Sequence, residues 1–485
     1  MNARAHALPA PFAPAGPPPG GKVAAPLVQW FVALLLICQV LLLFPEFAPV
    51  RMLIRMAAFG ASLVALLAVR GAIRQRHPSY ILGALTLGTV AIAVFHPYTT
   101  NLVAGGAQAA LYAAVLAPLF WVPRLRADTR ILQQTVLILF AFHTASAVLG
   151  VLQVYNPGSF QPPVSSIVAS KGKGYLESLM ITTASGVRVF RPMGLTDIPG
   201  GAAISGLYAV LFGAGFFLTR RNIWAMGGTA AAMAVGMTAL YLSQVRAVLV
   251  MTGIALMVLV AILVRRKDVA RLGTLGFVAA AVLVGGYFAA MSLAAPSVAR
   301  RVASLTAARP GAVYYQERGH FLFDAFTKLL PEAPFGRGLG HWGMMAAYFG
   351  SAEEAGRSVW VEIQWAGWIV DGGAPLAIFY CLALAAALWM AWKVASGRAP
   401  RSAPELPFWG AVVLAHGIGA FALTFSYPIF LSQPGMEFWL LNATLFAASR
   451  HALRVDRELK ASEAAPLPAT APPLPVHRVP RVPRR

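Results

Sequence analysis

The stretch RAVLVMTGIALMVLVAILV, residues 246–264, decides the fold class of this chain. After Arg246 it contains no charged residue, and the cationic run 265–267 follows at once. A helix needs about 20 apolar residues to cross the hydrocarbon core of a bilayer. Lysine and arginine accumulate at the cytoplasmic ends of such helices. The stretch therefore predicts a membrane-spanning helix whose C-terminal end lies in the cytoplasm.

Similar apolar runs recur along most of the 485 residues. Only 12% of the residues are charged, whereas soluble domains carry about 25%. We therefore expect an all-α integral membrane protein with about 12 transmembrane helices. The predicted spans are 28–46, 52–69, 80–96, 106–122, 131–154, 199–218, 223–243, 246–264, 273–292, 368–391, 407–427 and 434–450.

The distribution of cations predicts the orientation of these spans. If the N-terminus is cytoplasmic, most of the 39 lysines and arginines fall on the cytoplasmic side, and the short outer loops 97–105 and 428–433 contain none. This bias predicts a multi-pass protein with both termini in the cytoplasm. It also accounts for the net charge of +22, so we expect a lipid bilayer as partner and no nucleic acid.

The chain divides into a membrane domain, residues 28–450, and two tails. Residues 1–27 and 451–485 are rich in proline, and we expect both tails to be disordered in the cytoplasm. Two outer loops, about 155–198 and about 293–367, are much longer than ordinary connections. Long loops often carry function, so we expect the chemistry of this protein on the exoplasmic side.

The first outer loop ends in RVFRPMGLTDIPGG, residues 188–201. Asp197 is predicted to cap the next helix. Arg188 and Arg191 are harder to explain, because orientation rules do not favour cations just outside an outer helix start. Arg246, in the tight outer turn of SQVR (243–246), either anchors its helix at the lipid headgroups or belongs to a site.

The second outer loop contains a predicted amphipathic helix over residues 318–330, which should lie along the outer bilayer surface. After it comes PFGRGLGHWG, residues 334–343. This stretch lacks the G-K-[ST] ending of a nucleotide-binding loop, so its glycines are interpreted as turn residues. Arg337 is a candidate to contact phosphate, and His341 is a candidate general base.

Four features in this order resemble the O-antigen ligase and O-antigen (Wzy-type) polymerase family. They are RPMG at 191–194, SQVR at 243–246, Arg318 ahead of PFGRGLG at 334–340, and GGAPL at 372–376. The resemblance implies a GT-C-like glycosyltransferase of the bacterial inner membrane. It implies metal-independent, inverting transfer of glycan from a polyprenyl diphosphate carrier on the outer face, without any cofactor, in exopolysaccharide or O-antigen biosynthesis.

The resemblance also implies partners and binding residues. The donor is a polyprenyl-diphosphate-linked oligosaccharide, the acceptor is a glycan or a lipid-linked glycan, and a chain-length regulator protein is a possible partner. Arg191 and Arg246 match the arginines that hold the diphosphate in the family. Guanidinium binds phosphate in a bidentate manner and is always charged, so Arg318, Arg188 and Arg337 are further candidates. The outer loops contain no D-x-D motif, which favours chemistry without a metal.

The sequence departs from the family at one position. Where members carry a histidine before the next membrane helix, this chain has Glu362, and no histidine lies between His341 and His416. Either Glu362 or His341 is then the general base, or the protein binds or polymerises glycan differently from the ligases of the family. A partly buried carboxylate can deprotonate a sugar hydroxyl. Neighbouring tryptophans provide either a surface for a glycan or an aromatic belt at the membrane interface. They are Trp342, Trp360 and Trp365.

Three functions remain open from the sequence. The first is a glycan polymerase or ligase, and the missing histidine favours the polymerase. The second is a lipid-linked glycan flippase, which the scarcity of charge at mid-membrane depth disfavours. The third is a non-catalytic envelope assembly protein, which would have no affinity for polyprenyl diphosphate.

Overall fold

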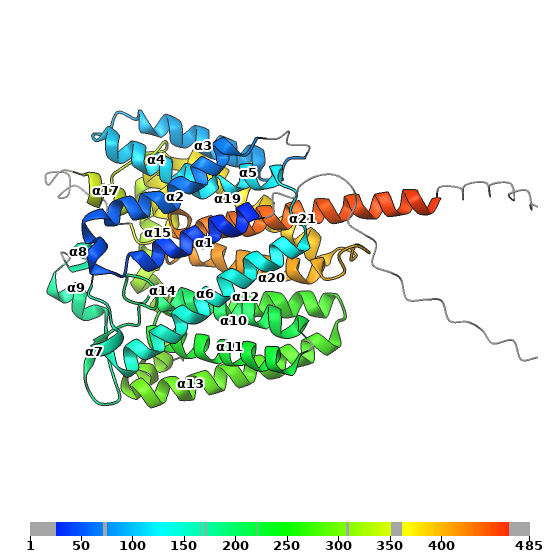
Figure 1. Ribbon diagram of the computed structural model, residues 1–485. Coiled ribbons are helices and arrows are strands. Elements are labelled where there is room, and N and C mark those ends of the chain that lie inside the picture. The colour runs from blue at the N-terminus through cyan, green and yellow to red at the C-terminus, as the bar shows by residue number, and fades with distance from the viewer. Residues whose placement is uncertain are drawn as a thin grey trace, which may run out of the picture.

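The computed structural model of the chain describes residues 26–70, 75–164, 166–169, 172–220, 222–306, 310–350 and 361–464. Among these residues, eight helices are long and apolar enough to cross a membrane, and the bent pair α4–α5 would make a ninth span. The described chain is thus an all-α membrane protein built as a bundle of long helices (Figure 1). Helices α1 and α3 have only 16 and 15 residues, so the total of twelve spans stays a prediction.

A helix occupies every region in which we predicted a span. The bundle helices are α1 (Pro26–Leu41), α2 (Arg51–Ala68), α3 (Tyr80–Val94), α4 (Leu102–Leu116), α5 (Pro118–Trp121), α6 (Thr129–Tyr155), α10 (Ala202–Thr219), α11 (Ile223–Ser243), α12 (Arg246–Arg265), α13 (Val269–Thr306), α19 (Gln364–Ser396), α20 (Leu406–Leu423) and α21 (Gln433–Ala464). Helix α21 corrects the predicted boundary of the C-terminal tail. It continues through residues 451–464, which we expected to be disordered, and it projects beyond the bundle (Figure 1).

Close packing in the bundle depends on small residues and large aromatic ones. Gly206 of α10 and Gly236 of α11 lie so close that an added Cβ on either would meet the other's backbone. Small residues permit this approach of two helices in a membrane. Helix α10 is one of the helices with the largest share of buried residues, whereas few residues of α2 are fully buried. The largest fully buried side chains include Trp121, Trp368, Trp409 and Trp439.

Most of the short elements gather at one end of the bundle, on the left in Figure 1. They are η1 (Pro45–Val50), α7 (Pro157–Phe160), α8 (Ser166–Ala169), α9 (Lys173–Ser178), β1 (Met180–Thr182), β2 (Arg188–Phe190), α17 (Gly343–Phe349) and η5 (Ile429–Leu431). The strands form an antiparallel hairpin in which Met180 faces Phe190. A further short helix, η2 (Val122–Arg124), follows α5. This end of the bundle is the one we expect to face outside.

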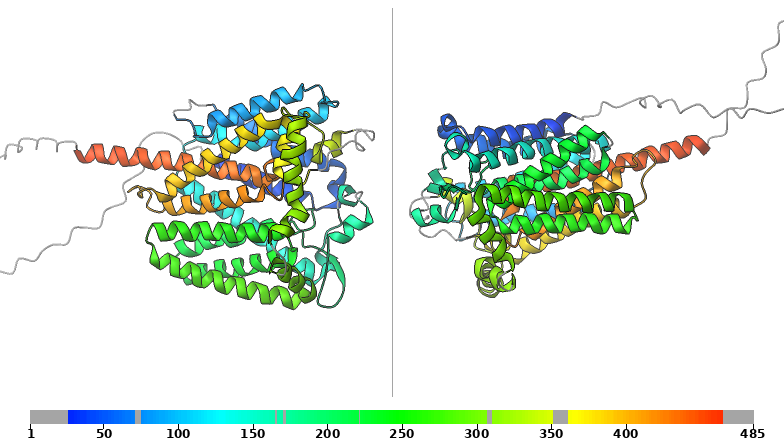
Figure 2. Two further views of the ribbon diagram at one scale, coloured as in Figure 1. Left: turned by 180° about the vertical axis from the view of Figure 1, so that it is seen from behind. Right: turned by 90° about the horizontal axis from the view of Figure 1, so that it is seen from below.

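The second outer loop contains one long helical segment instead of the single helix predicted over 318–330. It consists of α14 (Pro310–Tyr314), η3 (Tyr315–Gly319), α15 (His320–Asp324), η4 (Ala325–Leu329) and α16 (Leu330–Glu332), and η3 and η4 are π-helical. We call this segment the crosswise helix, because it runs across the end of the bundle (Figure 2). Leu322 and Leu329 pack against the core, whereas Asp324 and Lys328 form an ion pair of 2.7 Å on the exposed side. The segment is amphipathic, as we predicted.

Candidate functional site

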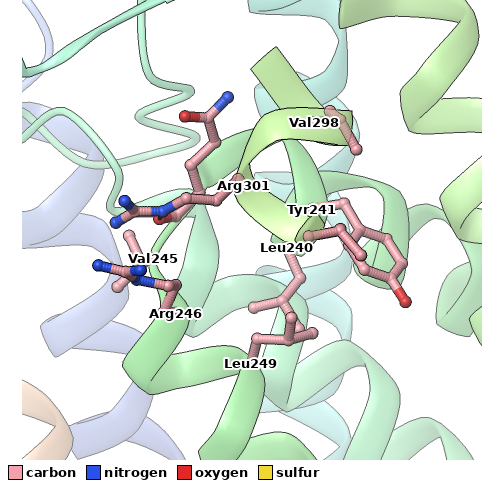
Figure 3. A pocket seen from close by; sticks show the side chains of 9 residues that line it. Leu240, Tyr241, Val245, Arg246, Leu249, Val298 and Arg301 are labelled. Carbon is pink, nitrogen blue, oxygen red and sulfur yellow. Dashed lines mark hydrogen bonds between the residues drawn. The ribbon is translucent and has the colours of Figure 1, made fainter. Parts of the chain in front are cut away.

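Three arginines from separate elements converge at the outer end of the bundle. Arg191 follows β2, Arg246 is the first residue of α12, and Arg301 lies near the C-terminal end of α13. Arg246 and Arg301 line one narrow pocket, and their guanidinium groups lie side by side and point in the same direction (Figure 3). Arg301 is also within electrostatic range of both Arg191 and Arg246. Arg301 was not among the predicted site residues.

Arg191 lies within electrostatic range of Arg246. Burial lowers the pKa of the Arg191 guanidinium, nearby Tyr175 partly raises it, and the charge of Arg246 lowers it further. The Arg191 backbone N–H donates to the carbonyl of Leu179 at 2.9 Å, and its Nη2 donates to the carbonyl of Ser178 at 2.9 Å. The segment at the end of α9 therefore holds the Arg191 backbone and one nitrogen of its guanidinium group from one side.

The turn between α11 and α12 places Arg246 and also orients Arg301. Gln244 in this turn has left-handed backbone angles, φ 57° and ψ 21°, which few residues other than glycine adopt. Its carbonyl accepts a hydrogen bond of 3.0 Å from Nε of Arg301. Helix α13 reaches this carbonyl because it is kinked at Ala294, just before Pro296. The available signal in the sequence was a proline, Pro296, five residues before a cation in a predicted outer segment.

The crosswise helix contributes two adjacent charged residues of opposite sign. Glu317 forms an ion pair with Arg246, and Arg318 forms one with Glu362. Both residues lie in the π-helical segment η3, and π-helical turns are frequent at functional sites. These pairs connect the crosswise helix to α12 on one side and to the start of α19 on the other.

Tyr175 of α9 is a further member of this group. It is within electrostatic range of Arg191 and of Arg318. Burial lowers the pKa of both guanidinium groups, and Tyr175 partly raises the pKa of each. In the described part of the chain, the group contains four guanidinium groups and two carboxylates. We call it the arginine cluster, and its members are Arg191, Arg246, Arg301, Arg318, Glu317, Glu362 and Tyr175.

The two candidates for the general base occupy different places. The side chain of Glu362 is 20% exposed and pairs with Arg318, so it belongs to the arginine cluster. His341 lies in the loop before α17, and its Nε2 is buried without a hydrogen-bond partner. Among the described residues, the ion pairs and the hydrogen bond that join the cluster do not include His341. Of the two candidates, Glu362 is the one that pairs with an arginine of the cluster.

The stretch 334–343 docks onto a break in α19. The Arg337 N–H donates to the carbonyl of Val370 at 2.7 Å, and the Ala374 N–H donates to that of Pro334 at 2.8 Å. Gly336, at φ +87°, lies so close to the backbone of Gly372 and Gly373 that a side chain would not fit. The glycines therefore serve both turn geometry and close approach. The GGAPL run forms this break inside α19, and α19 itself begins earlier than we predicted, at Gln364.

A buried carboxyl group that the sequence reading missed holds this loop in place. Asp371 in α19 is fully buried and accepts hydrogen bonds from Gln108 Nε2 at 2.7 Å, Tyr112 OH at 2.7 Å and Trp342 Nε1 at 2.8 Å. An acidic residue within an apolar span was the available signal. Trp342, which we expected to contact glycan, is buried in this network, and we no longer assign it that role.

The remaining predicted residues lie outside the arginine cluster or outside the described residues. Arg188 is exposed on β2, and its Nη2 donates to the carbonyl of Glu177 at 3.4 Å. Arg337 pairs with exposed Glu332 at 2.9 Å. Trp365 is partly buried, and its Nε1 donates to Thr424 Oγ1 at 3.2 Å. Trp360 lies outside the described residues.

Asp197 does not cap α10, so this prediction is wrong. Helix α10 begins at Ala202, and Gly201 occupies the capping position. The carboxylate of Asp197 instead pairs with two arginines of α2, Arg51 at 3.5 Å and Arg55. The reason is that the chain between Asp197 and α10 forms a turn that carries Asp197 toward α2.

The pocket beside Arg246 and Arg301 has room for about one water molecule, with a volume of about 10 Å³. In the described ranges, no three His, Cys, Asp or Glu side chains gather so that they could hold a metal ion, and metal-independence stays a prediction.

Comparison with known proteins finds no family model and no curated protein that matches this chain.

Proposed function

We propose that this protein transfers glycan from a polyprenyl diphosphate carrier to a glycan or lipid-linked acceptor, in a polymerisation or ligation step of exopolysaccharide or O-antigen assembly. The reaction is placed on the outer face of the bacterial inner membrane. One observation carries the proposal: Arg191, Arg246 and Arg301 converge beside the Arg318–Glu362 pair. These three arginines come from distant parts of the chain, and such convergence of cations at a membrane surface suits a phosphate ligand.

The leaving group explains why several arginines are useful. In the proposed reaction an acceptor hydroxyl oxygen attacks C1 of the donor sugar, and the bond between C1 and the diphosphate oxygen breaks with inversion. Negative charge then builds on the diphosphate oxygens. Guanidinium groups already fixed in position stabilise this charge more in the transition state than in the ground state. Arg191, Arg246 and Arg301 take this role.

The general base in this proposal is Glu362. It accepts the proton of the acceptor hydroxyl as the new glycosidic bond forms, and it later releases that proton to water. Its ion pair with Arg318 holds the carboxylate beside the crosswise helix. The acceptor hydroxyl must approach the carboxylate within hydrogen-bond distance.

The placement of the cluster suits a lipid-linked donor. The crosswise helix packs its apolar side against the bundle and brings Glu317 and Arg318 to the outer end. A carrier whose diphosphate lies at the membrane surface and whose prenyl chain remains in the bilayer would reach this end directly. The polymerase is favoured over the ligase because Glu362 replaces the histidine that the ligases of the resembled family use.

A lipid-linked glycan flippase is a second candidate because of one observation within the bundle. Tyr208 OH donates to Glu437 Oε2 at 2.6 Å and lies 3.1 Å from Nε2 of His416, and all three side chains are buried. Buried ionisable residues of this kind are typical of transport pathways. Loss of translocation, without loss of bond formation, in Glu437→Gln would favour this second function.

The decisive experiment compares Arg191→Ala and Arg246→Ala with Arg300→Ala in purified protein reconstituted into nanodiscs. Arg300 is a matched control because its Nε donates to the carbonyl of Pro296 in its own helix. Glycan transfer from a polyprenyl-diphosphate-linked donor is measured together with donor binding. We expect both properties to be lost in the first two variants only. Wild-type transfer by either variant would refute the role of that arginine, and a wild-type protein that neither binds the donor nor transfers glycan would favour a non-catalytic assembly protein.

A further inference from the structure

The loop 191–201, which carries Arg191, is held at several points along its length. The side chain of Gln153 in α6 makes three hydrogen bonds to its backbone. Nε2 donates to the carbonyl of Gly194 at 3.0 Å, and Oε1 accepts from the N–H groups of Met193 at 2.8 Å and Gly194 at 2.9 Å. Ser146 Oγ, also in α6, accepts from the Leu195 N–H at 2.9 Å. One face of the loop is therefore fixed to α6.

The opposite side of the loop is fixed to α2 by charge. The carboxylate of Asp197 lies between Arg51, at 3.5 Å, and Arg55. Only 9% of the Asp197 side chain and 18% of each arginine side chain are exposed. Partly buried pairs are screened by salt much less than surface pairs, so this contact is well suited to hold a fixed geometry. Few residues of helix α2 are fully buried.

The geometry of the loop connects this contact to the arginine cluster. Gly200, at φ +87°, lies beside the side chains of Arg191 and Val245, and Val245 immediately precedes Arg246. The loop therefore leaves β2 at Arg191, is tied to α2 at Asp197, and returns to Arg191 and the start of α12 at Gly200. A shift of the chain at Asp197 would move Gly200 and change the position of Arg191 relative to Arg246.

We propose that Asp197, held by Arg51 and Arg55, is a positioning residue that fixes the loop 191–201 so that Arg191 faces the diphosphate together with Arg246. This inference rests on the function proposed above. Asp197 itself does not contact the diphosphate. It acts through Arg191, and the two arginines of α2 act through Asp197.

The test uses full-length protein in nanodiscs and compares Asp197→Asn, Asp197→Glu and Arg55→Gln. Asp268→Asn is the matched control, because Asp268 also pairs with an arginine, Arg271 at 3.2 Å, but lies at the junction of α12 and α13, at the other end of α12 from Arg246. Three properties are measured: hydrogen exchange of the amides of residues 193–195, binding of polyprenyl diphosphate, and glycan transfer as separate kcat and KM values. The unfolding temperature serves to detect general destabilisation.

We expect Asp197→Asn and Arg55→Gln to accelerate amide exchange at 193–195 and to weaken binding of polyprenyl diphosphate. The value of kcat should fall about 10- to 100-fold, because misplacing a positioned group by about 1 Å has effects of this order. The KM for the acceptor should not change, and Asp197→Glu should recover most of kcat. A merely structural role would lower the amount of folded protein and leave kcat per folded molecule unchanged.

Wild-type exchange, binding and kcat in Asp197→Asn would overturn the inference, even if Arg191→Ala still abolishes transfer. Accelerated exchange with unchanged binding and kcat would overturn it as well, because the loop would then be held by Asp197 without any effect on Arg191. If Arg191→Ala and Arg246→Ala both bind and transfer normally, the proposed function fails instead, and the exchange measurement still reports whether Asp197 fixes the loop.

Discussion

Arg318 of the crosswise helix forms an ion pair with Glu362, the residue that precedes α19 by two positions. The preceding residue, Glu317, pairs with Arg246 of α12. Two adjacent residues thus link a surface helix to two membrane helices that are distant in sequence. This arrangement brings the candidate base and the candidate diphosphate-binding residues into one cluster, so variants at each position have distinguishable consequences.

Replacement of Glu362 by glutamine should abolish most glycan transfer. The amide keeps the size of the side chain but cannot accept a proton, and general base catalysis contributes typically about 10²- to 10⁴-fold. Transfer by purified Glu362→Gln is measured next to Glu332→Gln, a control that removes the exposed partner of Arg337. Full activity of Glu362→Gln would remove Glu362 as the base, and His341→Gln would become the variant to measure.

Replacement of Arg301 by alanine should weaken donor binding, although this residue was not among the predicted site residues. Its guanidinium lies beside that of Arg246, and its loss removes one of the cations that would face the diphosphate (Figure 3). Arg301→Lys should restore only part of the binding, because an ammonium group cannot make the bidentate contact of guanidinium. Binding of polyprenyl diphosphate by Arg301→Ala, Arg301→Lys and Arg300→Ala is the measurement. Equal affinities in all three would contradict a role for Arg301.

Replacement of Trp342 by phenylalanine should destabilise the protein by about 1–3 kcal/mol. An aromatic ring smaller than indole remains, and Asp371 loses one of its three donors in a fully buried position. Thermal unfolding in detergent is compared with that of Trp365→Phe, which deletes an indole hydrogen bond to neutral Thr424. The Trp342 variant should unfold at the lower temperature. The reverse order would indicate that Asp371 does not depend on this bond.

Replacement of Gly336 by alanine should destabilise the docking of residues 334–343 on α19. A side chain at φ +87° is strained, and its Cβ would overlap the backbone of Gly372 and Gly373. We expect a loss of about 1–3 kcal/mol in the free energy of unfolding. Gly311→Ala in the crosswise helix is the control, because its Cβ would enter open space and alanine favours the helix. Similar unfolding temperatures for the two variants would disprove this reading of the loop.

The amino-acid sequence by itself determined the membrane class, the positions of the helices and the elements that carry the site. Apolar runs of about 20 residues specify helices wherever the rest of the fold places them, because the bilayer satisfies no backbone hydrogen bonds. Short stretches of sequence were also enough to recognise the amphipathic pattern of the crosswise helix and the unusual arginines Arg191 and Arg246 in the predicted outer loops. The motif order also selected Arg318 and Glu362, which the structure brings together.

The tertiary structure alone decided which of these residues meet. Arg301 joins the cluster because α13 kinks at Ala294 and continues past its predicted end. Asp197 does not cap α10, because the turn before α10 brings its carboxylate to two arginines of α2. Trp342 and Asp371 become partners only when the loop 334–343 docks on α19. The physical reason is that hydropathy acts along the chain, whereas ion pairs and buried hydrogen bonds depend on distances between segments that are far apart in the sequence.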